Sequence, residues 1–519
     1  MKKIILIVLD GWGIAPDGPG NCISQAHIPF YNSLLEKYPH CQLHAHGNAV
    51  GLREDAMGTS EVGHLHMGAG RIVWQPIAQI DRDIKNGEFF KNKKLVSAME
   101  TVRKRKTRLH FMGICSDGGV HSSIEHLDAL LKLAKQQKVP KVYIHFFSDG
   151  RDVPEKSALT YVKQVEKQIQ KNGIGKIASV IGRYYAGDRD NNWDRTQKAF
   201  DCLVNGKGFT AKNASDAVQQ AYARGDLTDY YIQPTIISEK NKPLATISDG
   251  DVAIFFNIRT DRIRQLIKSI VLPNFKGFKR PKTPKVDFYS FVQTETAIPA
   301  NKCVPIFNPI RIKNNLGNQI ARQGYKQLRV AETDKYAHVT YFFNSQVDEP
   351  NPGEDRIMVP SPKVPVYDQK PEMSAREITE KVTEQIKTGK YDFILMNYAN
   401  ADLVGHSANI PAIIIGVQTI DQCLQHVIEN ALAKNYSIMV TADHGNAEEK
   451  LSPTGERIAS HSCNPVPFIL VSNEPELQKT FLRSNGQLID IAPTILELMN
   501  LSIPKEMTGK SLILKNQKK

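Results

Sequence analysis

The sequence predicts an α/β fold with two domains, each a mainly parallel sheet flanked by helices. Three observations support this prediction. The chain has 519 residues, more than a single hydrophobic core comfortably accommodates. Short apolar runs recur along it, and amphipathic stretches of helical length lie between them. Unalternated apolar strands interleaved with helices are typical of parallel sheets covered on both faces.

The predicted strands follow one another along the whole chain. They are residues 4–9, 109–115, 142–147, 177–181, 252–256, 286–291, 393–396, 438–440 and 468–471. The clearest helices are predicted at residues 123–137, 155–171, 374–387 and 411–433, where apolar side chains recur with a helical period. The proline-rich stretch at residues 349–371 is incompatible with a helix or a central strand, so we expect a long ordered loop or a lid there.

Two irregular, proline-bearing stretches are predicted to be the crossings between the domains. They lie near residues 71–79 and 298–309. Aspartates and histidines with catalytic chemistry concentrate at the two ends of the chain, whereas a run of arginines lies in the middle. We therefore expect a discontinuous outer domain, residues 1–76 and 309–519, with residues 77–308 inserted as a second domain.

Composition narrows the class of protein. The net charge of +13 favours anionic partners, but the basic run at residues 103–106 has no nucleic-acid-binding motif beside it and is interpreted as an exposed helix end. Seven scattered cysteines without a C-x-x-C pair indicate buried thiols in a reducing cytoplasm. No apolar run is long enough to span a membrane. We expect neither a nucleic-acid nor a membrane partner.

Polar residues with catalytic chemistry follow the predicted strands. Asp10 ends the first strand, Ser148-Asp149-Gly150-Arg151-Asp152 follows the third, and Asp402 and Asp443-His444 follow later ones. Open parallel sheets bind ligands beyond the carboxyl ends of their strands. This placement is the one that an active site requires.

The aspartates and histidines near the two ends of the chain predict a metal site. Asp402 and His406 are four residues apart and face one ion if that turn is helical, while Asp10, Asp443-His444 and His461 lie near strand ends. Three Asp and three His without Cys suit Mn²⁺, Zn²⁺ or Mg²⁺-like ions, with mixed N/O ligation favouring Mn²⁺. These candidate ligands are more than one ion can bind, so two ions close to each other are expected. Taken singly, each residue is more often a turn, a helix cap or a loop hydrogen-bonding group, but these roles explain poorly why all six lie near strand ends.

Ser60 lies among glycines at a predicted helix start. One interpretation makes Ser60 the N-cap of that helix, with Gly63 relieving crowding. The other makes it a nucleophile that needs a metal ion to lower its hydroxyl pKa, with the helix N-terminus receiving phosphate oxygens. The pattern alone leaves both interpretations open.

Read together, these segments resemble the cofactor-independent phosphoglycerate mutases of the alkaline phosphatase superfamily. The matching segments are VLDGWG at residues 8–13, GTSEVGH at 58–64, SDGGVHS at 116–122, SDGRD at 148–152, GRYY at 182–185, DRD at 188–190, NIRTDR at 257–262, NYANADLVGH at 397–406 and TADHGN at 441–446, with His461. They run in family order over essentially the whole length. Three positions depart from the family pattern: Thr59, Ser123 and Thr260.

The resemblance implies a monomeric isomerase of glycolysis and gluconeogenesis that interconverts 3-phosphoglycerate and 2-phosphoglycerate without 2,3-bisphosphoglycerate. It implies that Asp402, His406 and His461 hold one Mn²⁺, and that Asp10, Ser60, Asp443 and His444 hold the other, with Co²⁺ or Zn²⁺ as alternatives. Ser60 is then the nucleophile that becomes phosphoserine. The implied substrate-binding residues are His121, Arg151, Asp152, Arg183, Arg189, Arg259, Arg262 and, near the phosphoryl group, Lys335. The outer domain is then alkaline-phosphatase-like and the insertion transferase-like.

The chemistry of the reaction suits these residue types. Arginines bind phosphate and carboxylate through a planar fork, which a lysine lacks. Asp152 is the candidate for moving protons between the glycerate hydroxyls. Two alternatives remain at this point: another member of the superfamily, such as a metal-dependent phosphomonoesterase or a different sugar-phosphate mutase, and a basic polyanion-binding protein with structural metal.

Overall fold

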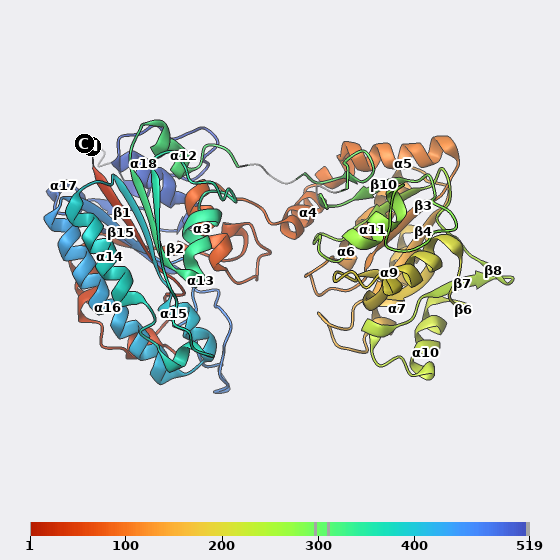
Figure 1. Ribbon diagram of the computed structural model, residues 1–519, viewed down its shortest axis with the longest axis horizontal. Helices are drawn as coiled ribbons and strands as arrows, with labels where there is room; N and C mark the ends of the chain where they lie inside the picture. The colour runs from red at the N-terminus through yellow and green to blue at the C-terminus, as the bar shows by residue number, and fades with distance from the viewer. Residues whose placement is uncertain (1, 295–297, 309–311, 515–519) are drawn as a thin grey trace. The chain divides into compact units, whose positions relative to one another are not determined.

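The computed structural model describes residues 2–294, 298–308 and 312–514. Its contacts divide the chain into two compact units, unit 1 with Met1–Gln75 and Arg311–Lys519, and unit 2 with Pro76–Ile310 (Figure 1). The step from unit 1 to unit 2 falls inside the first predicted crossing. The second predicted crossing covers residues 298–309, and the boundary expected at residue 309 lies outside the described residues.

Unit 1 is built on an eight-stranded sheet with the order β13-β12-β14-β1-β15-β16-β2-β18. The strands are β1 (Lys3–Leu9), β2 (His40–His44), β12 (Gln327–Glu332), β13 (Glu354–Val359), β14 (Phe393–Tyr398), β15 (Tyr436–Thr441), β16 (Val466–Val471) and β18 (Gly486–Gln487). The pairs among β13, β12, β14, β1 and β15 are parallel, and β16 pairs antiparallel with β15 and β2. Ile4 to Leu9 of β1 are fully buried, because this central strand is covered on both faces.

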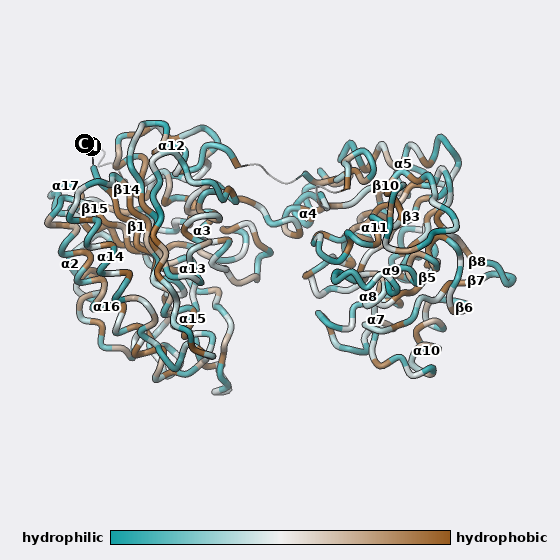
Figure 2. The backbone as a smooth tube through the Cα atoms, viewed as in Figure 1, coloured by the Kyte–Doolittle hydropathy of each residue, from teal (hydrophilic) through white to brown (hydrophobic). Residues whose placement is uncertain are grey.

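Helices cover both faces of the unit 1 sheet (Figure 1). They are α1 (Cys22–Gln25), α2 (Pro29–Lys37), α3 (Ser60–Ala69), α12 (Leu316–Arg322), α13 (Thr333–Ala337), α14 (Ala375–Thr388), α15 (Asn400–Leu403), α16 (Ile410–Ala433), α17 (Pro475–Gln478) and α18 (Ile491–Leu498). The helices α14 and α16 pack side by side, and α16 also packs on α2. Figure 2 shows the result as hydrophobic strands inside a hydrophilic exterior. A small pair of strands, β17 (Phe481–Leu482) and β19 (Ile513–Leu514), lies near the end of the described chain.

Unit 2 is built on a nine-stranded sheet, in which eight strands follow the order β11-β10-β9-β3-β4-β5-β7-β6 and β8 pairs with β7. The strands are β3 (Leu109–Ile114), β4 (Val142–Ser148), β5 (Lys176–Gly182), β6 (Phe209–Ala211), β7 (Thr235–Glu239), β8 (Lys242–Pro243), β9 (Val252–Phe255), β10 (Asp287–Ser290) and β11 (Val304–Pro305). The four central strands β9, β3, β4 and β5 are parallel neighbours. Their carboxyl ends therefore lie along one edge of the sheet.

The unit 2 sheet also has a hydrophobic core on each face. The helices are α4 (Pro76–Lys85), α5 (Lys93–Arg105), α6 (Ile124–Gln136), α7 (Ala158–Asn172), α8 (Arg183–Ala186), α9 (Trp193–Phe200), α10 (Ala214–Arg224) and α11 (Arg264–Val271). Side chains of α5, α6, α7 and α10 belong to one core, and those of α8, α9 and α11 to the other. The predicted α/β class with parallel-rich sheets is confirmed.

Two local predictions have different outcomes. The basic run at residues 103–106 is the exposed end of α5, as predicted. The expectation of only a loop or lid at residues 349–371 is wrong, because β13 lies inside that stretch. The strand fits between Pro352 and Pro360 and needs a partner on one side only, since it is the edge strand beside β12. No helix in the described part of the chain combines the length and apolar composition that spanning a bilayer requires.

A chain of hydrogen bonds crosses the interior of unit 2. His110 Nε2 lies 3.2 Å from Asp251 Oδ2, His110 Nδ1 lies 3.0 Å from His145 Nε2, and His145 Nδ1 lies 2.8 Å from the Ser179 hydroxyl. One tautomer of each histidine satisfies all three bonds: Ser179 donates to His145, His145 donates to His110, and His110 donates to Asp251. Both histidines are buried, and burial lowers the pKa of each below its usual value.

These histidines predict acid sensitivity of unit 2. They stay neutral in the folded chain but take up protons below pH about 6.5 when unfolded, so their contribution to stability is complete above that pH and declines below it. Below that pH, each histidine lowers the free energy of unfolding by up to about 1.4 kcal/mol per pH unit. We expect His145→Gln, which keeps a donor and an acceptor but does not titrate, to show a smaller loss of amide protection in β3–β5 between pH 7 and 5.5. Hydrogen exchange checks this, with exposed His44→Gln as the control; equal losses in the wild type and His145→Gln would contradict it.

Candidate active site

The carboxyl edge of the unit 1 sheet gathers the residues predicted to bind metal. The adjacent parallel strands β12, β14, β1 and β15 end just before Lys335, Asp402, Asp10 and Asp443, respectively. These four side chains are buried, and His444 is buried beside them. Segments more than 400 residues apart in the sequence, Asp10 and Asp443, therefore meet at one place, where His444 Nε2 lies 3.5 Å from Asp10 Oδ1.

Ser60 is buried at the start of α3 and points at this cluster. Its hydroxyl lies 3.1 Å from Asp10 Oδ1 and 3.0 Å from His444 Nε2, and it accepts a hydrogen bond of 2.7 Å from Lys335 Nζ. The interpretation of Ser60 as the N-cap is wrong, because Thr59 caps α3 by accepting from the backbone N–H of Val62. The Ser60 side chain is thus free of a capping role and contacts acidic and basic groups.

Gly63 has a function other than the relief of helix crowding. A Cβ atom at Gly63 would lie 2.7 Å from the Cβ of Asp443, so only glycine lets α3 approach the end of β15 this closely. The approach brings Ser60 and Asp443 into the same cluster.

Lys335 is the buried cation of the cluster. Its ammonium donates to Asp10 Oδ1 and to Asp402 Oδ2, each at 2.6 Å. Burial acts to lower the pKa of Lys335, but Asp10 and Asp402 outweigh burial and hold that pKa above its usual range. Burial, followed by the charge of Asp443, raises the pKa of Asp10 to about 6. One ammonium facing three buried carboxylates leaves room for further positive charge.

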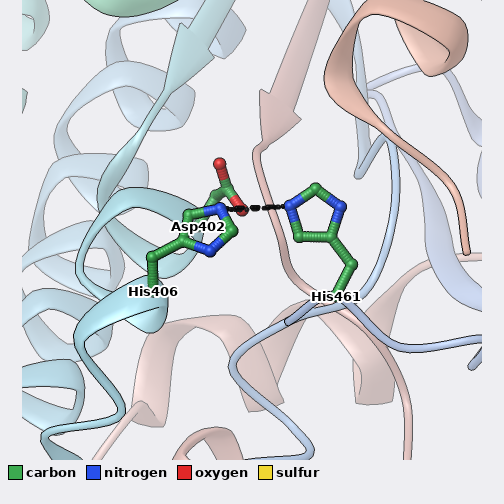
Figure 3. Close-up of side chains that lie close together, drawn as sticks. All are labelled: Asp402, His406 and His461. Carbon is green, nitrogen blue, oxygen red and sulfur yellow. Dashed lines mark hydrogen bonds and ion pairs between the residues drawn. The ribbon is translucent and has the colours of Figure 1, made fainter. Parts of the chain in front are cut away.

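Asp402, His406 and His461 form a second cluster next to the first (Figure 3). The two histidine Nε2 atoms lie 3.3 Å and 3.1 Å from Asp402 Oδ1, and 3.2 Å from each other. Each Nδ1–H is used at 2.8 Å on a backbone carbonyl, that of Ala459 for His406 and that of Gly58 for His461. With Nδ1 protonated in a neutral ring, Nε2 carries a lone pair, so three lone pairs converge on one place. This donor set fits a divalent cation.

Two more triplets have ligand atoms within 4.8 Å of one another: Asp10, Asp402 and His444, and Asp10, His64 and Asp443. Asp443 Oδ2 is buried and accepts no hydrogen bond of regular geometry from the described residues, although His64 Nδ1 lies nearby, so it keeps a lone pair for a cation. His64 was missed by the sequence reasoning, although it ends the GTSEVGH segment. Its Nδ1 lies 2.9 Å from the Ser60 carbonyl and 3.3 Å from Asp443 Oδ2. Asp10, Asp402 and His444 suit a divalent metal ion. In the other triplet both His64 ring nitrogens already have partners, because Nδ1 faces the Ser60 carbonyl and Nε2 accepts from Asn397 Nδ2 at 3.2 Å.

The carboxyl edge of the unit 2 sheet carries most of the predicted substrate-binding residues. His121 follows β3, Arg151 and Asp152 follow β4, and Arg183 follows β5. Arg183 is buried and donates to Asp149 Oδ1 and, at 2.6 Å, to Asp152 Oδ2. Asp149, which the sequence reasoning did not single out, also accepts from Ser116 and from the backbone N–H of Asp152, so it organises the turn after β4.

His121 lies between two carboxylates. Its Nε2 is 3.7 Å from Asp152 Oδ2 and its Nδ1 is 3.7 Å from Asp261 Oδ1. Burial and then the positive charge of Arg183 lower the pKa of His121 to about 4. Its Nδ1 has no hydrogen-bond partner among the described residues, so this neutral ring keeps a polar atom for a ligand.

The remaining arginines differ in their surroundings. Arg189 Nη1 donates to Asp261 Oδ2 at 2.8 Å, and Arg259 Nε lies 3.7 Å from Asp261 Oδ1. Arg262 is buried and donates to the carbonyl of Gly187 at 3.0 Å. Arg151, Arg189 and Arg259 are exposed. The structure thus joins His121, Asp152 and Arg183 by direct contacts and places Arg189 and Arg259 around Asp261.

Two of the three departures from the family pattern have a local explanation. Thr59 is the N-cap of α3 and Ser123 is the N-cap of α6, where its hydroxyl accepts from the backbone N–H of Glu125 at 3.4 Å. Both residue types are favoured at N-caps. Nothing in the structure explains Thr260.

Comparison with known proteins gives consistent matches along the chain. The family model described as BPG-independent PGAM N-terminus matches residues 80–296, and that described as Type I phosphodiesterase / nucleotide pyrophosphatase matches residues 293–465. A Moorella thermoacetica protein named 2,3-bisphosphoglycerate-independent phosphoglycerate mutase is 48% identical over 515 residues, covering 99% of each chain. A Clostridium beijerinckii protein of the same name is 46% identical over 513 residues, with 99% of each chain covered. A crystal structure of Leishmania mexicana phosphoglycerate mutase at low cobalt concentration aligns with a TM-score of 0.63 and 29% identity, over 99% of this chain and 98% of that one.

Proposed function

This chain belongs to the family of 2,3-bisphosphoglycerate-independent phosphoglycerate mutases, and from that premise we propose that it interconverts 3-phosphoglycerate and 2-phosphoglycerate through a phosphoserine at Ser60. The observation that carries the phosphoserine proposal is the position of the Ser60 hydroxyl. It lies at the N-terminus of α3 and within 3.1 Å of Asp10, His444 and Lys335 at once. A helix N-terminus favours phosphate oxygens, and Lys335 adds a fixed positive charge beside the reacting oxygen.

The transfer takes place in two balanced steps. In the first, Ser60 Oγ forms a bond to phosphorus as the bond from phosphorus to O3 of glycerate breaks, and O3 takes up the proton that Ser60 gives up. In the second, O2 of the same glycerate bonds to phosphorus, Ser60 regains a proton, and the bond from Ser60 Oγ to phosphorus breaks. The protein supplies in-line positioning and compensation of charge rather than redox chemistry.

The donor sets in unit 1 are proposed to hold two Mn²⁺ ions, with Co²⁺ or Zn²⁺ able to replace them. Asp402, His406 and His461 would hold one ion, and Asp10, Ser60, Asp443 and His444 the other. When bound, such ions act as Lewis acids that acidify a coordinated hydroxyl and neutralise phosphoryl charge. The donor groups are too many for one ion and form more than one cluster, which supports a count of two.

Unit 2 is proposed to hold the glycerate. Arg151, Arg183, Arg189, Arg259 and Arg262 offer planar forks for the substrate carboxylate and phosphate. His121, held neutral, donates or accepts a hydrogen bond without adding charge. Asp152 moves the proton between O3 and O2, because it is a carboxylate that Arg183 fixes in place from one side. On this proposal unit 1 is the phosphatase-like domain and unit 2 the transferase-like domain of a monomer, and neither 2,3-bisphosphoglycerate nor a nucleic acid takes part.

Metal removal tests the proposal. We expect the metal-stripped protein to lose mutase activity and to regain it with Mn²⁺ in the absence of 2,3-bisphosphoglycerate. Rapid quenching of the Mn²⁺-loaded protein with substrate, followed by intact-protein mass spectrometry and peptide mapping, is expected to place one phosphoryl group on Ser60. Activity that persists without divalent ions, or a phosphoryl group on another residue, would overturn the proposed mechanism.

A further inference from the structure

We propose that Lys450 is a positioning residue that holds Asp402, His406 and His461 in the arrangement that accepts a metal ion. This inference rests on the metal-binding role proposed above for those three residues. Lys450 belongs neither to that set nor to the reacting groups, and its side chain is completely buried.

The Lys450 ammonium has three donors, and they point at three acceptors. They are Asn446 Oδ1, the backbone carbonyl of Ser460 at 3.1 Å and the backbone carbonyl of Gly405 at 3.5 Å. Within the described part of the chain the ammonium forms no ion pair with a carboxylate. Its hydrogen-bond partners among the described residues are thus neutral oxygens from three different segments of unit 1, with the Gly405 carbonyl the most distant.

Each acceptor leads to one member of the cluster. Asn446 turns its amide so that Nδ2 donates to Asp402 Oδ1 at 2.7 Å. Gly405 directly precedes His406, and Ser460 directly precedes His461. One buried cation therefore fixes the carboxylate through an amide and fixes the two imidazoles through the backbone next to them.

Regular secondary structure contributes little to the position of His461. Between the end of β15 at Thr441 and the start of β16 at Val466 the chain forms no helix and only isolated bridges. His461 is therefore placed by few backbone bonds, such as that from the Ser462 N–H to the Gly445 carbonyl at 3.0 Å, together with side-chain contacts. Lys450 lies in the same stretch, where its own N–H donates to the Gly20 carbonyl at 2.8 Å and its carbonyl accepts from Ile458 at 3.0 Å. These two backbone hydrogen bonds hold Lys450 in place, so its ammonium can orient the loop that carries His461.

Gly405 gives an independent indication that this contact is close. A Cβ atom at Gly405 would lie 2.6 Å from Asn446 Oδ1, the oxygen that accepts from Lys450. The backbone at Gly405 is not in the left-handed region, so glycine is needed here for space rather than for conformation. Space is kept open for the amide that links Lys450 to Asp402.

A buried ammonium without a carboxylate partner is costly to the folded state, and an apolar side chain of similar length would fill the same volume. A purely structural Lys450 would therefore gain from replacement by methionine. A positioning Lys450 would lose metal affinity in the same replacement, because the Asn446 amide could then rotate and release Asp402. The two roles therefore differ in the metal affinity they predict for Lys450→Met: an unchanged affinity for a structural lysine and a weaker affinity for a positioning one.

The test measures Mn²⁺ binding to metal-stripped full-length protein by isothermal titration calorimetry, with thermal unfolding of the same samples. We expect Lys450→Met to weaken one of two Mn²⁺ equivalents by about 10-fold to 100-fold and to leave the other unchanged, the usual effect of losing a group that orients a ligand. Arg329→Met is the matched control, because Arg329 is also a fully buried cation of unit 1 but contacts Gln327 and Glu354 instead. It is expected to keep both Mn²⁺ equivalents.

A second variant covers the case in which Lys450→Met does not fold. Gly405→Ala leaves Lys450 in place but displaces Asn446 Oδ1, and it is expected to weaken the same Mn²⁺ equivalent. In an Asn446→Ala background, Lys450→Met should cost less further Mn²⁺ affinity than it does in the wild type, because the part of its effect that passes through the Asn446 amide is already lost. Folded variants that bind both Mn²⁺ ions as tightly as the wild type would overturn the inference, whereas a wild-type protein that binds no Mn²⁺ would instead overturn the proposed function.

Discussion

Replacing Ser60 with alanine is expected to lower kcat by at least about 10⁴-fold and to abolish phosphorylation of the protein. The physical reason is that the Ser60 hydroxyl is the single point on which Asp10, His444 and Lys335 converge. Alanine removes the reacting oxygen but little volume, and Thr59 still caps α3. The measurement is the mutase rate with Mn²⁺, together with intact-protein mass after rapid quenching with substrate.

Thr59→Ala is the matched control for Ser60→Ala. It removes the neighbouring hydroxyl, which caps the helix, and should cost about 1 kcal/mol of stability while leaving phosphorylation in place. If Ser60→Ala still acquired a phosphoryl group, the nucleophile would be elsewhere. If Thr59→Ala lost phosphorylation as completely as Ser60→Ala, the effect would belong to the helix start rather than to the serine.

Replacing Asp152 with asparagine is expected to separate the two halves of the reaction. Asparagine has the same shape and still accepts from Arg183 through its carbonyl oxygen, but it neither takes up nor releases a proton near neutral pH. Loss of a general acid and base typically costs between about 10² and 10⁴ in rate. We expect the mutase rate to fall by this factor while Ser60 still acquires a phosphoryl group from 3-phosphoglycerate.

Asp128→Asn controls for the general effect of losing a carboxylate from unit 2. Asp128 bonds Lys171 and Asn172 near the surface and contacts none of the proposed substrate-binding residues. It should keep the full mutase rate. A mutase rate for Asp152→Asn close to that of the wild type would remove Asp152 from the proton transfer and leave it the role of holding Arg183.

The sequence predicted the gathering of Asp10, Asp402 and Asp443 for a simple reason. Each follows an apolar strand, and the carboxyl ends of parallel strands share one edge of a sheet. This inference required only that the strands run parallel, and it did not require their order in the sheet. Lys335 was different: it came from the family resemblance alone, because no strand had been assigned to residues 327–332 and nothing local marked that lysine.

Other features of the site needed three dimensions. His64 looks like any helical histidine until α3 is packed against the end of β15, and Lys450 looks like a surface lysine until the loop after β15 closes over it. Ser60 and Thr59 are both good N-cap residues, so only the helix geometry decides between them. The Asp251–His110–His145–Ser179 chain is equally hidden, because its members come from strands and turns far apart in sequence.

The position of β1 has a consequence for the order of synthesis. β1 leaves the ribosome before the other strands that the structure describes, but its two neighbours in the sheet are β14 and β15, and Ile4 pairs with Phe393 and Ser437. At about 5–20 residues per second, the nearer partner emerges roughly 20 to 80 seconds later. Every strand of unit 2 is made within that interval. The whole of unit 2 has therefore been synthesised before β1, the central strand of unit 1, has either of its partner strands.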